Sequence, residues 1–166
     1  SKQASEFGIS PAQTLLASAA MPAEIEAAGP DVMRGLRSVS FYEPNLNDKT
    51  RAWAAAFSAR SAGKTPSGPH AATYSEVRHY LAAIQAAGTD DADAVVAKMR
   101  EMPVSDAFTP NGRLRADGQL VHDMYVFSVK KPPRGGSKDY SQITRVVPAE
   151  QAFPSLAESE CPLVRK

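Results

Sequence analysis

The sequence predicts an α/β fold in which helices flank parallel sheets. Three observations lead to this prediction. Short apolar segments alternate with helical segments in the N-terminal part, two helical patterns follow each other between Pro66 and Pro103, and a strongly strand-like stretch occupies residues 119–130. Alternation of strands and helices is typical of a sheet covered by helices.

The composition is that of a globular protein without a strong charge. The chain has 166 residues, of which 43% are apolar, and it carries 19 basic and 18 acidic side chains. This balance argues against nucleic acid or an anionic membrane surface as a partner. No apolar run approaches the roughly 20 residues of a membrane-spanning helix. The single cysteine, Cys161, excludes an internal disulfide; it stays unpaired or, in a longer parent chain, pairs with a cysteine outside this segment.

The first forty residues predict helices and strands in alternation. Ser1–Phe7 looks like the end of a helix, with Gly8 as a stop, and the apolar run Thr14–Ala19 is typical of a buried strand. Met21–Gly29 has proline near its start and glycine at its end, as a short helix does. Leu36–Phe41 predicts a strand in which Val39 and Phe41 share one face and two serines share the other.

A longer helix is expected next, from the N-cap Asn47 to about Ala62. Trp53 and Phe57, four residues apart, fall on one face, which we expect to be buried. Gly63 closes this helix.

The central helix pair is joined at Gly88, which ends the first helix. In that first helix the spacing of Tyr74, Val77, Leu81 and Ile84 predicts a buried stripe.

Thr89 or Asp90 is expected to cap the second helix of the pair, and Pro103 to stop it. We expect the two helices to pack through the Val77/Leu81/Ile84 stripe. The side chains expected to be buried on the second helix are Ala92, Val95, Val96, Met99 and Met102.

The C-terminal third predicts strands and turns. Asn111-Gly112 and Asp117-Gly118 are turn dipeptides, and Gln119–Lys130 predicts a strand buried on both faces near its centre. A Pro/Gly-rich loop at 131–138 precedes a last strand around Ile143–Val147, and a tail from Pro148 is expected to run over the surface.

No cluster of polar residues has the spacing of a catalytic or metal site. His70, His79 and His122 lack metal-ligand spacing, and His122 and Asp123 point to opposite faces if they lie in a strand. Gly63-Lys64-Thr65 lacks the glycine that a phosphate-binding loop needs at position 58. We therefore expect no catalytic residue, metal or cofactor, and we expect that the protein is not an enzyme.

Several fragments carry a resemblance to a known family: P-S-G-P at Pro66–Pro69, the Tyr74–Gly88 helix, N-G-R-L-R-A-D-G at Asn111–Gly118, H-D-M-Y-V-F at His122–Phe127 and C-P-L-V at Cys161–Val164. The chain resembles the C-terminal part of the periplasmic (extracellular) ligand-binding proteins of branched-chain-amino-acid-type ABC transporters. Members of that family are considerably longer.

The resemblance implies part of a two-lobed type I periplasmic binding protein fold. Residues 1–43 would belong to the second lobe, 44–118 to the first lobe, and 119–166 to the second lobe and the C-terminal tail. It implies a periplasmic protein that holds a small carboxylate- or amide-type ligand, such as an amino acid or an aromatic acid, between the lobes and delivers it to a membrane permease. The alternative is the ligand-sensing domain of a receptor or regulator. The segment alone is expected to associate with itself or with a missing N-terminal half.

The resemblance also implies candidate ligand-binding residues. Tyr74 looks like a tyrosine that lines the ligand's side-chain pocket, with a core contact as its alternative, and His70 stands at a helix N-terminus suited to a carboxylate. Ala20 and Met21 occupy the turn after the first strand, where amino-acid-binding relatives place an acid; here the nearest acid is Glu24. Phe41 and Tyr42 would supply aromatic walls or hinge packing; these two residues complete the predicted site.

Overall fold

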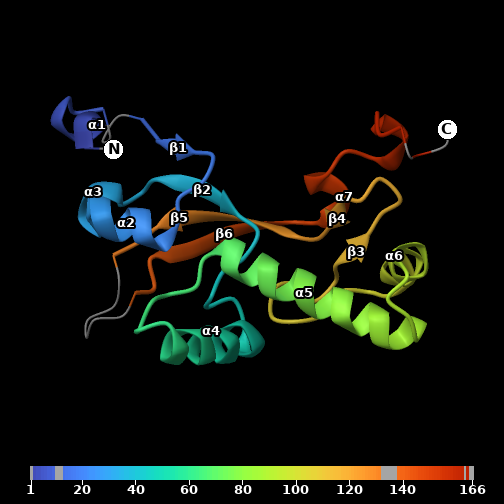
Figure 1. Ribbon diagram of the computed structural model, residues 1–166. Helices are drawn as coiled ribbons and strands as arrows, with labels where there is room; N and C mark the ends of the chain where they lie inside the picture. The colour runs from blue at the N-terminus through green and yellow to red at the C-terminus, as the bar shows by residue number, and fades with distance from the viewer. Residues whose placement is uncertain (1, 10–12, 132–137, 163, 165–166) are drawn as a thin grey trace. The chain divides into compact units, whose positions relative to one another are not determined.

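The computed structural model describes residues 2–9, 13–131, 138–162 and 164 (Figure 1). It divides the chain into two compact units, Ser1–Gly68 with Met124–Val146, and Pro69–Asp123 with Val147–Lys166. The predicted lobe boundaries at 43/44 and 118/119 refer to a longer protein, and they stay a prediction.

The first unit is a mixed sheet with helices, which confirms the predicted α/β class. Its elements are α1 (Lys2–Glu6), β1 (Leu16–Ala17), α2 (Pro22–Ala28), α3 (Pro30–Met33), β2 (Arg37–Ser40), α4 (Asp48–Arg60), β5 (Met124–Val129) and β6 (Ser141–Val147).

The strand order in this sheet is β1-β2-β5-β6. β1 runs parallel to β2, whereas β5 runs antiparallel to β2. The Lys130 N–H donates to the Tyr140 carbonyl, and the Thr144 hydroxyl donates to the Val126 carbonyl. These two bonds set β6 antiparallel to β5, so β1 and β2 form the parallel part of the sheet.

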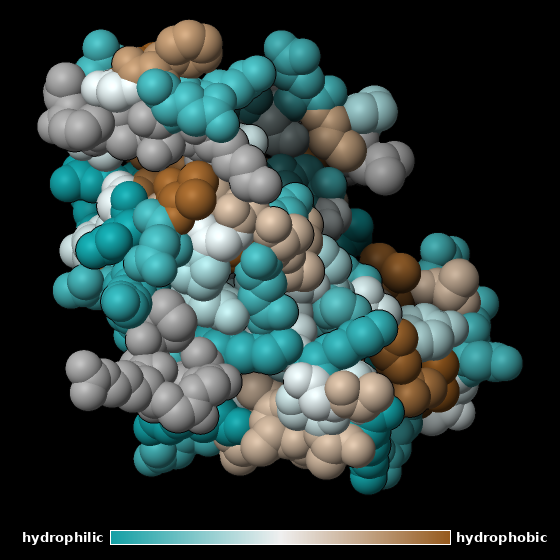
Figure 2. All heavy atoms as spheres, turned by 90° about the vertical axis from the view of Figure 1, so that its left-hand side faces the viewer, coloured by the Kyte–Doolittle hydropathy of each residue, from teal (hydrophilic) through white to brown (hydrophobic). Residues whose placement is uncertain are grey.

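The buried face of β2 is its serine face. Ser38 stands opposite Phe127 in the register and is buried with it, while Val39 is 44% exposed. The Ser38 hydroxyl is satisfied because it donates to the Ala17 carbonyl over 3.0 Å. The helices α2 and α3 cover this face (Figure 1). Figure 2 faces the side of the molecule on which they lie, where hydrophilic and apolar side chains are intermixed. The core residues are Ile25, Met33, Leu36, Phe127, Val129 and Tyr140.

The predicted strand Gln119–Lys130 is wrong in two respects. It forms two strands, because His122 and Asp123 separate β4 (Leu120–Val121) from β5. The His122 ring packs edge-on against Phe108 and Phe153, at 4.9 and 5.3 Å between centroids, which turns the chain out of the ladder. In β5 every second residue is buried and the residues between are half-buried, so the burial predicted for both faces is complete on only one.

The second unit contains α5 (Gly68–Ala87), α6 (Ala92–Glu101), the antiparallel strands β3 (Arg113–Leu114) and β4, α7 (Ala149–Ala152) and the 3-10 helix η1 (Leu156–Glu158). Gly88 ends α5 with φ of +69°, as predicted. The cap of α6 is Asp91, whose Oδ1 accepts the Ala94 N–H over 3.0 Å, and not Thr89 or Asp90.

The predicted buried stripe on α5 is wrong. Val77 and Leu81 are 53% and 57% exposed, and Tyr74 is exposed as well. The buried positions are Ala71, Ser75, His79 and Ala83, which are mostly small and so allow close approach of the backbone.

The expected burial on α6 is confirmed in part. Val95 is buried, whereas Ala92 and Val96 are exposed and Met99 and Met102 are half-buried. The expected packing of the α5 stripe on Val95 and Met99 is therefore wrong.

Several local predictions are confirmed. The Asn47 Oδ1 accepts the Thr50 N–H over 3.0 Å and begins α4, and Gly63 follows its end with φ of +74°. The Asp117-Gly118 turn joins β3 to β4. The pairing of Cys161 with a cysteine outside this segment, like its alternative of an unpaired thiol, stays a prediction. The predicted loop 131–138 lies outside the described residues except for its two ends.

Candidate functional site

The ends of two parallel strands lie next to each other in the first unit. Ala20 and Met21 follow β1, and Phe41 and Tyr42 follow β2. Because β1 and β2 are parallel neighbours, their carboxyl ends meet at one edge of the sheet. In α/β sheets this edge is where ligands bind. Four of the six predicted site residues thus come from one place in the fold.

The turn after β1 places one apolar side chain inward and one outward. Ala20 packs against the core, while Met21 is exposed and precedes α2. Glu24 accepts the Met21 N–H over 2.9 Å, so this acid caps the start of α2. The carboxylate that we considered for a ligand ammonium group is therefore engaged with the backbone.

Phe41 packs against the first residue of α5. A Cβ atom built on Gly68 would lie 2.5 Å from Cε2 of the Phe41 ring, so only glycine leaves room for this ring position. The glycine of P-S-G-P, Gly68, therefore packs directly against the segment that follows β2.

Tyr42 is buried and serves mainly as packing. Its ring lies edge-on to Trp53, with centroids 5.6 Å apart, and the Trp53 ring in turn packs at a tilt against Phe57 in α4. The Tyr42 hydroxyl makes no hydrogen bond to any described residue. Burial, together with the neighbouring Glu43 carboxylate, raises the pKa of this hydroxyl.

Glu43 is a buried acid next to the predicted site residues, and the sequence prediction missed it. Burial raises the pKa of its carboxyl to about 7, although hydrogen bonds with the Ser141 and Ser40 hydroxyls act in the opposite direction. Asp139 raises this pKa and Lys130 lowers it, in smaller measure. The only sequence signal was an acid directly after a buried strand, and that pattern is too common to single it out.

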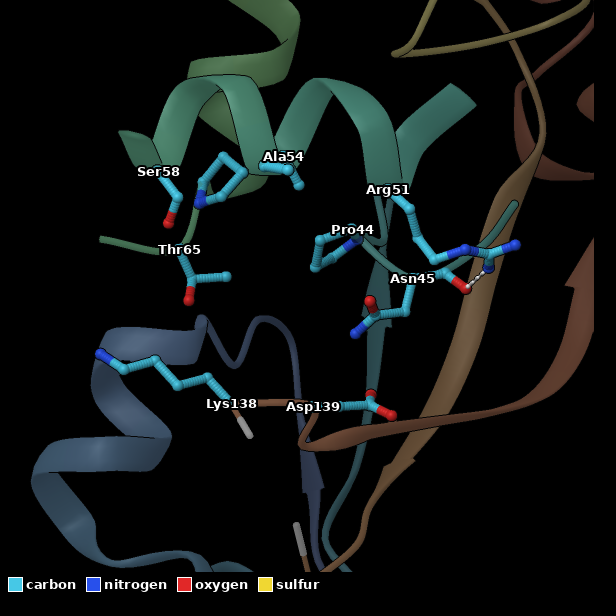
Figure 3. Close-up of a pocket in the computed structure, with 10 residues that line it drawn as sticks. Pro44, Asn45, Arg51, Ala54, Ser58, Thr65, Lys138 and Asp139 are labelled. Carbon is cyan, nitrogen blue, oxygen red and sulfur yellow. Dashed lines mark hydrogen bonds between the residues drawn. The ribbon is translucent and has the colours of Figure 1, made fainter. Parts of the chain in front are cut away.

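A cavity of about 320 Å³ lies between α4 and the residues that precede β6 (Figure 3). The Asn45 side chain points into it from the segment after β2, and the Ser58 and Thr65 hydroxyls face it from the opposite side. Its polar lining residues are Asn45, Arg51, Ser58, Thr65, Lys138 and Asp139.

The charged groups around this cavity are paired. The Arg51 guanidinium binds Asp48 and donates to the Asn45 carbonyl over 3.1 Å. The Lys138 ammonium lies 3.2 Å from the Glu26 carboxylate of α2. Asp139 lies 2.7 Å from the Lys130 ammonium.

The neutral groups of the cavity are available to a ligand. Within the described residues, the Asn45 carboxamide and the Thr65 hydroxyl make no hydrogen bond. A cavity with paired charges and open neutral donors and acceptors favours a ligand without net charge.

The other two predicted site residues lie in the second unit. His70 and Tyr74 are both exposed and stand four residues apart near the start of α5, so they share a side of that helix. The alternative interpretation of Tyr74 was a core contact. Tyr74 is exposed, so this alternative is wrong.

The three histidines do not form a chemical site. His79 Nε2 lies 2.9 Å from the Met99 carbonyl oxygen, and His122 Nδ1 lies 2.8 Å from the Asp123 carbonyl oxygen. The Asp123 carboxylate accepts the Ala149 N–H over 3.1 Å, so it does not act on His122. Among the residues that the structure describes, no three His, Cys, Asp or Glu side chains gather as a metal would require.

Solved structures match both the fold and the sequence over nearly the whole chain. A periplasmic binding protein from Burkholderia mallei is 36% identical, with a TM-score of 0.88 over 99% of this chain and 44% of that one. A branched-chain amino acid ABC transporter periplasmic ligand-binding protein from Burkholderia xenovorans LB400 is also 36% identical, with a TM-score of 0.90 over 98% of this chain and 44% of that one. The fold is thus part of the type I periplasmic binding protein fold.

The family model described as periplasmic binding protein matches residues 1–137. The chain belongs to the periplasmic binding protein family, whose fold neighbours are solute-binding proteins and not enzymes.

More distant structures share the fold. A solute-binding protein from Rhodopseudomonas palustris in complex with benzoate is 21% identical, with a TM-score of 0.61 over 75% of this chain and 33% of that one. No curated protein matches the chain. This chain spans less than half the length of the two Burkholderia proteins. Among the described residues, no helix has the length and apolar character needed to cross a membrane.

Proposed function

We propose that this chain is part of a solute-binding protein that captures a small carboxylate- or amide-type ligand in a cleft between two lobes and delivers it to an ABC permease in the periplasm. Membership of the periplasmic binding protein family carries this proposal. Relatives described as binding branched-chain amino acids or benzoate indicate the range of ligands, an amino acid or an aromatic acid. The protein binds its ligand without reacting with it.

The proposed ligand contacts are the six residues that the family resemblance predicts. In the first unit, Ala20 and Met21 supply an apolar rim, and Phe41 supplies an aromatic wall. Tyr42 supports that wall through its contact with Trp53. In the second unit, His70 and Tyr74 contribute a helix N-terminus and an aromatic ring. The segment 44–118 belongs to one lobe, and 1–43 with 119–166 belongs mainly to the other.

The paired charges around the Asn45 cavity support a ligand without net charge, such as an amide or a zwitterionic amino acid. An anionic ligand would have to displace one of the existing ion pairs, which costs more than binding a neutral group. This preference separates amides and amino acids from simple acids.

The remaining walls of the cleft come from other polypeptide. Because the chain spans 44% of the length of its Burkholderia relatives, most of their length has no counterpart here. A segment equivalent to their remaining part, or a second copy of this chain, covers the exposed side chains of α5.

A thermal-shift screen tests the proposed function. L-leucine, benzamide and benzoate are each titrated into the purified chain and into any longer polypeptide that contains it. Binding raises the unfolding temperature progressively with ligand concentration. We expect benzamide or L-leucine to stabilise more than benzoate, with the ligand recovered unchanged.

Two variants connect that stabilisation to the predicted residues. Met21→Ala is expected to weaken it, whereas Leu16→Ala, which changes a more exposed side chain nearby, leaves it unchanged. Absence of stabilisation by all three compounds in both polypeptides would contradict the proposal. Conversion of any of them into a product would contradict the non-catalytic assignment.

A further inference from the structure

The second compact unit has a cavity of its own, with a volume of about 620 Å³. This volume is within the range of roughly 300–1,000 Å³ that small-molecule sites occupy. The cavity is formed by the β3–β4 hairpin, the end of α6, α7 and the segment that leads into η1. None of these residues belongs to the site proposed above.

The floor of this cavity is apolar. Leu114, Val121, Phe153 and Leu156 line it. Val121 is buried, and Phe153 is held by the edge-on contact with the His122 ring. Leu156 is 39% exposed, so it offers apolar surface that a ligand could cover. Such a floor favours a ligand with an aromatic or branched aliphatic body.

The rim of the cavity is cationic. Arg115 is neutralised by Asp117, with N–O distances of 2.5 and 3.1 Å, and it also donates to the Pro154 carbonyl. Arg100 donates to the Ala116 carbonyl over 3.1 Å but has no carboxylate partner among the described residues. The Arg113 guanidinium makes no hydrogen bond or ion pair within the described part of the chain, and the same holds for the Glu150 carboxylate. Two guanidinium groups and one carboxylate therefore remain around the cavity.

We propose that this cavity is a second ligand site, which binds a small monocarboxylate with an apolar body. The carboxylate is bound by the Arg113 guanidinium, whose planar donor pair matches the two oxygens, with Arg100 adding positive charge. The apolar body covers Leu156 and Phe153. Glu150 leaves the rim with a single net positive charge, which suits a monoanion and disfavours a dianion. This site is independent of the cleft ligand.

Phenylacetate and phenylacetamide test this site, because they differ in charge and share the apolar body. Each is titrated into the 15N-labelled chain, and amide chemical shifts are followed. We expect saturable shifts from phenylacetate in residues 113–121 and 149–156, with a Kd of about 1 mM or tighter. Phenylacetamide is expected to bind at least tenfold more weakly. Added salt is expected to weaken the binding of phenylacetate, because the guanidinium groups are at the surface.

Matched variants identify the two halves of the site. Arg113→Gln removes the guanidinium and is expected to lower the affinity for phenylacetate at least tenfold, because a charge-assisted hydrogen bond is lost. Leu156→Asn is expected to lower the affinity for both compounds. The same substitutions outside the cavity, Arg145→Gln on β6 and Leu16→Asn on β1, are expected to change neither affinity. Arg113 and Leu156 are partly or fully exposed, so these variants should fold.

Three results would overturn the proposal. The first is the absence of saturable shifts in residues 113–121 and 149–156. The second is equal affinity for the acid and the amide. The third is an Arg113→Gln variant that binds phenylacetate as tightly as the unsubstituted chain does.

Discussion

The Nε2 atom of His79 on α5 lies 2.9 Å from the carbonyl oxygen of Met99 on α6. Since a carbonyl oxygen accepts, the imidazole donates, and one buried N–H joins the two helices. His79 is 8% exposed, so water does not replace this bond when it is lost. The contact between the helices therefore depends on a polar side chain with small neighbours, and not on the large apolar side chains of α5.

His79→Ala is expected to lower the free energy of unfolding by about 1–3 kcal/mol, because it leaves the Met99 carbonyl without its donor. Leu81→Ala on the same helix is the control, and its effect should stay below about 0.5 kcal/mol, as for other surface changes. Urea denaturation of both variants measures the difference. A larger loss for Leu81→Ala than for His79→Ala would show that the apolar stripe is the packed face.

Glu43 should make the stability of the first unit depend on pH. Its carboxyl is 7% exposed, with a pKa raised from 4.5 to about 7. Below pH 4.5 the Glu43 carboxyl is protonated in both the folded and the unfolded states. Between pH 4.5 and 7 it ionises in the unfolded state but stays mostly protonated in the folded state, so the free energy of unfolding falls as pH rises. The total loss should reach about 3 kcal/mol above the folded-state pKa.

Glu43→Gln is expected to remove this dependence, whereas Glu76→Gln, at an exposed position of α5, should keep it. Denaturation midpoints measured at intervals between pH 4 and 8 would reveal the slope. A flat profile for the unsubstituted chain would mean that Glu43 ionises normally despite its burial.

Asp91→Ala should cost about 1 kcal/mol, because α6 loses the acceptor for the Ala94 N–H. Asp90→Ala removes an equal charge one residue earlier and should change stability by less than about 0.5 kcal/mol. Thermal unfolding of the two variants distinguishes the observed cap from the one that the sequence suggested. Equal losses would indicate a charge effect on the helix dipole and no specific cap.

Gly68→Ala is expected to destabilise the first unit by about 1–3 kcal/mol, because the new methyl group overlaps the Phe41 ring. The overlap disappears when Phe41 is shortened. In the Phe41→Ala background, Gly68→Ala should therefore cost much less, and a double-mutant cycle measures this coupling. Additive effects of the two changes would place the ring away from Gly68.

The exposed side chains of α5 should make the isolated chain associate. Tyr74, Val77, Tyr80 and Leu81 leave apolar surface open over about two helical turns, and surfaces of this kind mark interaction sites. Sedimentation of the purified chain should show self-association that the double variant Val77→Glu, Leu81→Glu abolishes. An unsubstituted chain that stays monomeric at high concentration would contradict this prediction.

The sequence by itself determined the local features of this protein. Asn47 as a helix cap, Gly63 and Gly88 as helix ends, and the Asp117-Gly118 turn were all predictable, because each depends on the conformational preference of one residue and its immediate neighbours. The α/β class followed from the order of these local elements. The family resemblance was likewise carried by short contiguous fragments, and the family model and the related structures confirm it.

The candidate site was predictable in part. Residues 20–21 and 41–42 follow strands whose existence the sequence indicated, and parallel pairing of β1 and β2 brings them to one sheet edge. Their contact with a ligand stays a prediction. Asn45 and Thr65 were missed, because their importance comes from a cavity built by segments far apart in the chain.

Only the tertiary structure decided which faces are buried. The Val77/Leu81 stripe was predicted from polarity, but burial depends on what lies opposite. His79 and Ser38 are buried because the Met99 and Ala17 carbonyls satisfy their polar groups, while Val77, Leu81 and Val39 meet no partner within the described chain that covers them. A hydrogen bond between residues far apart in the sequence leaves no periodic pattern of residue types, so residue spacing could not reveal it.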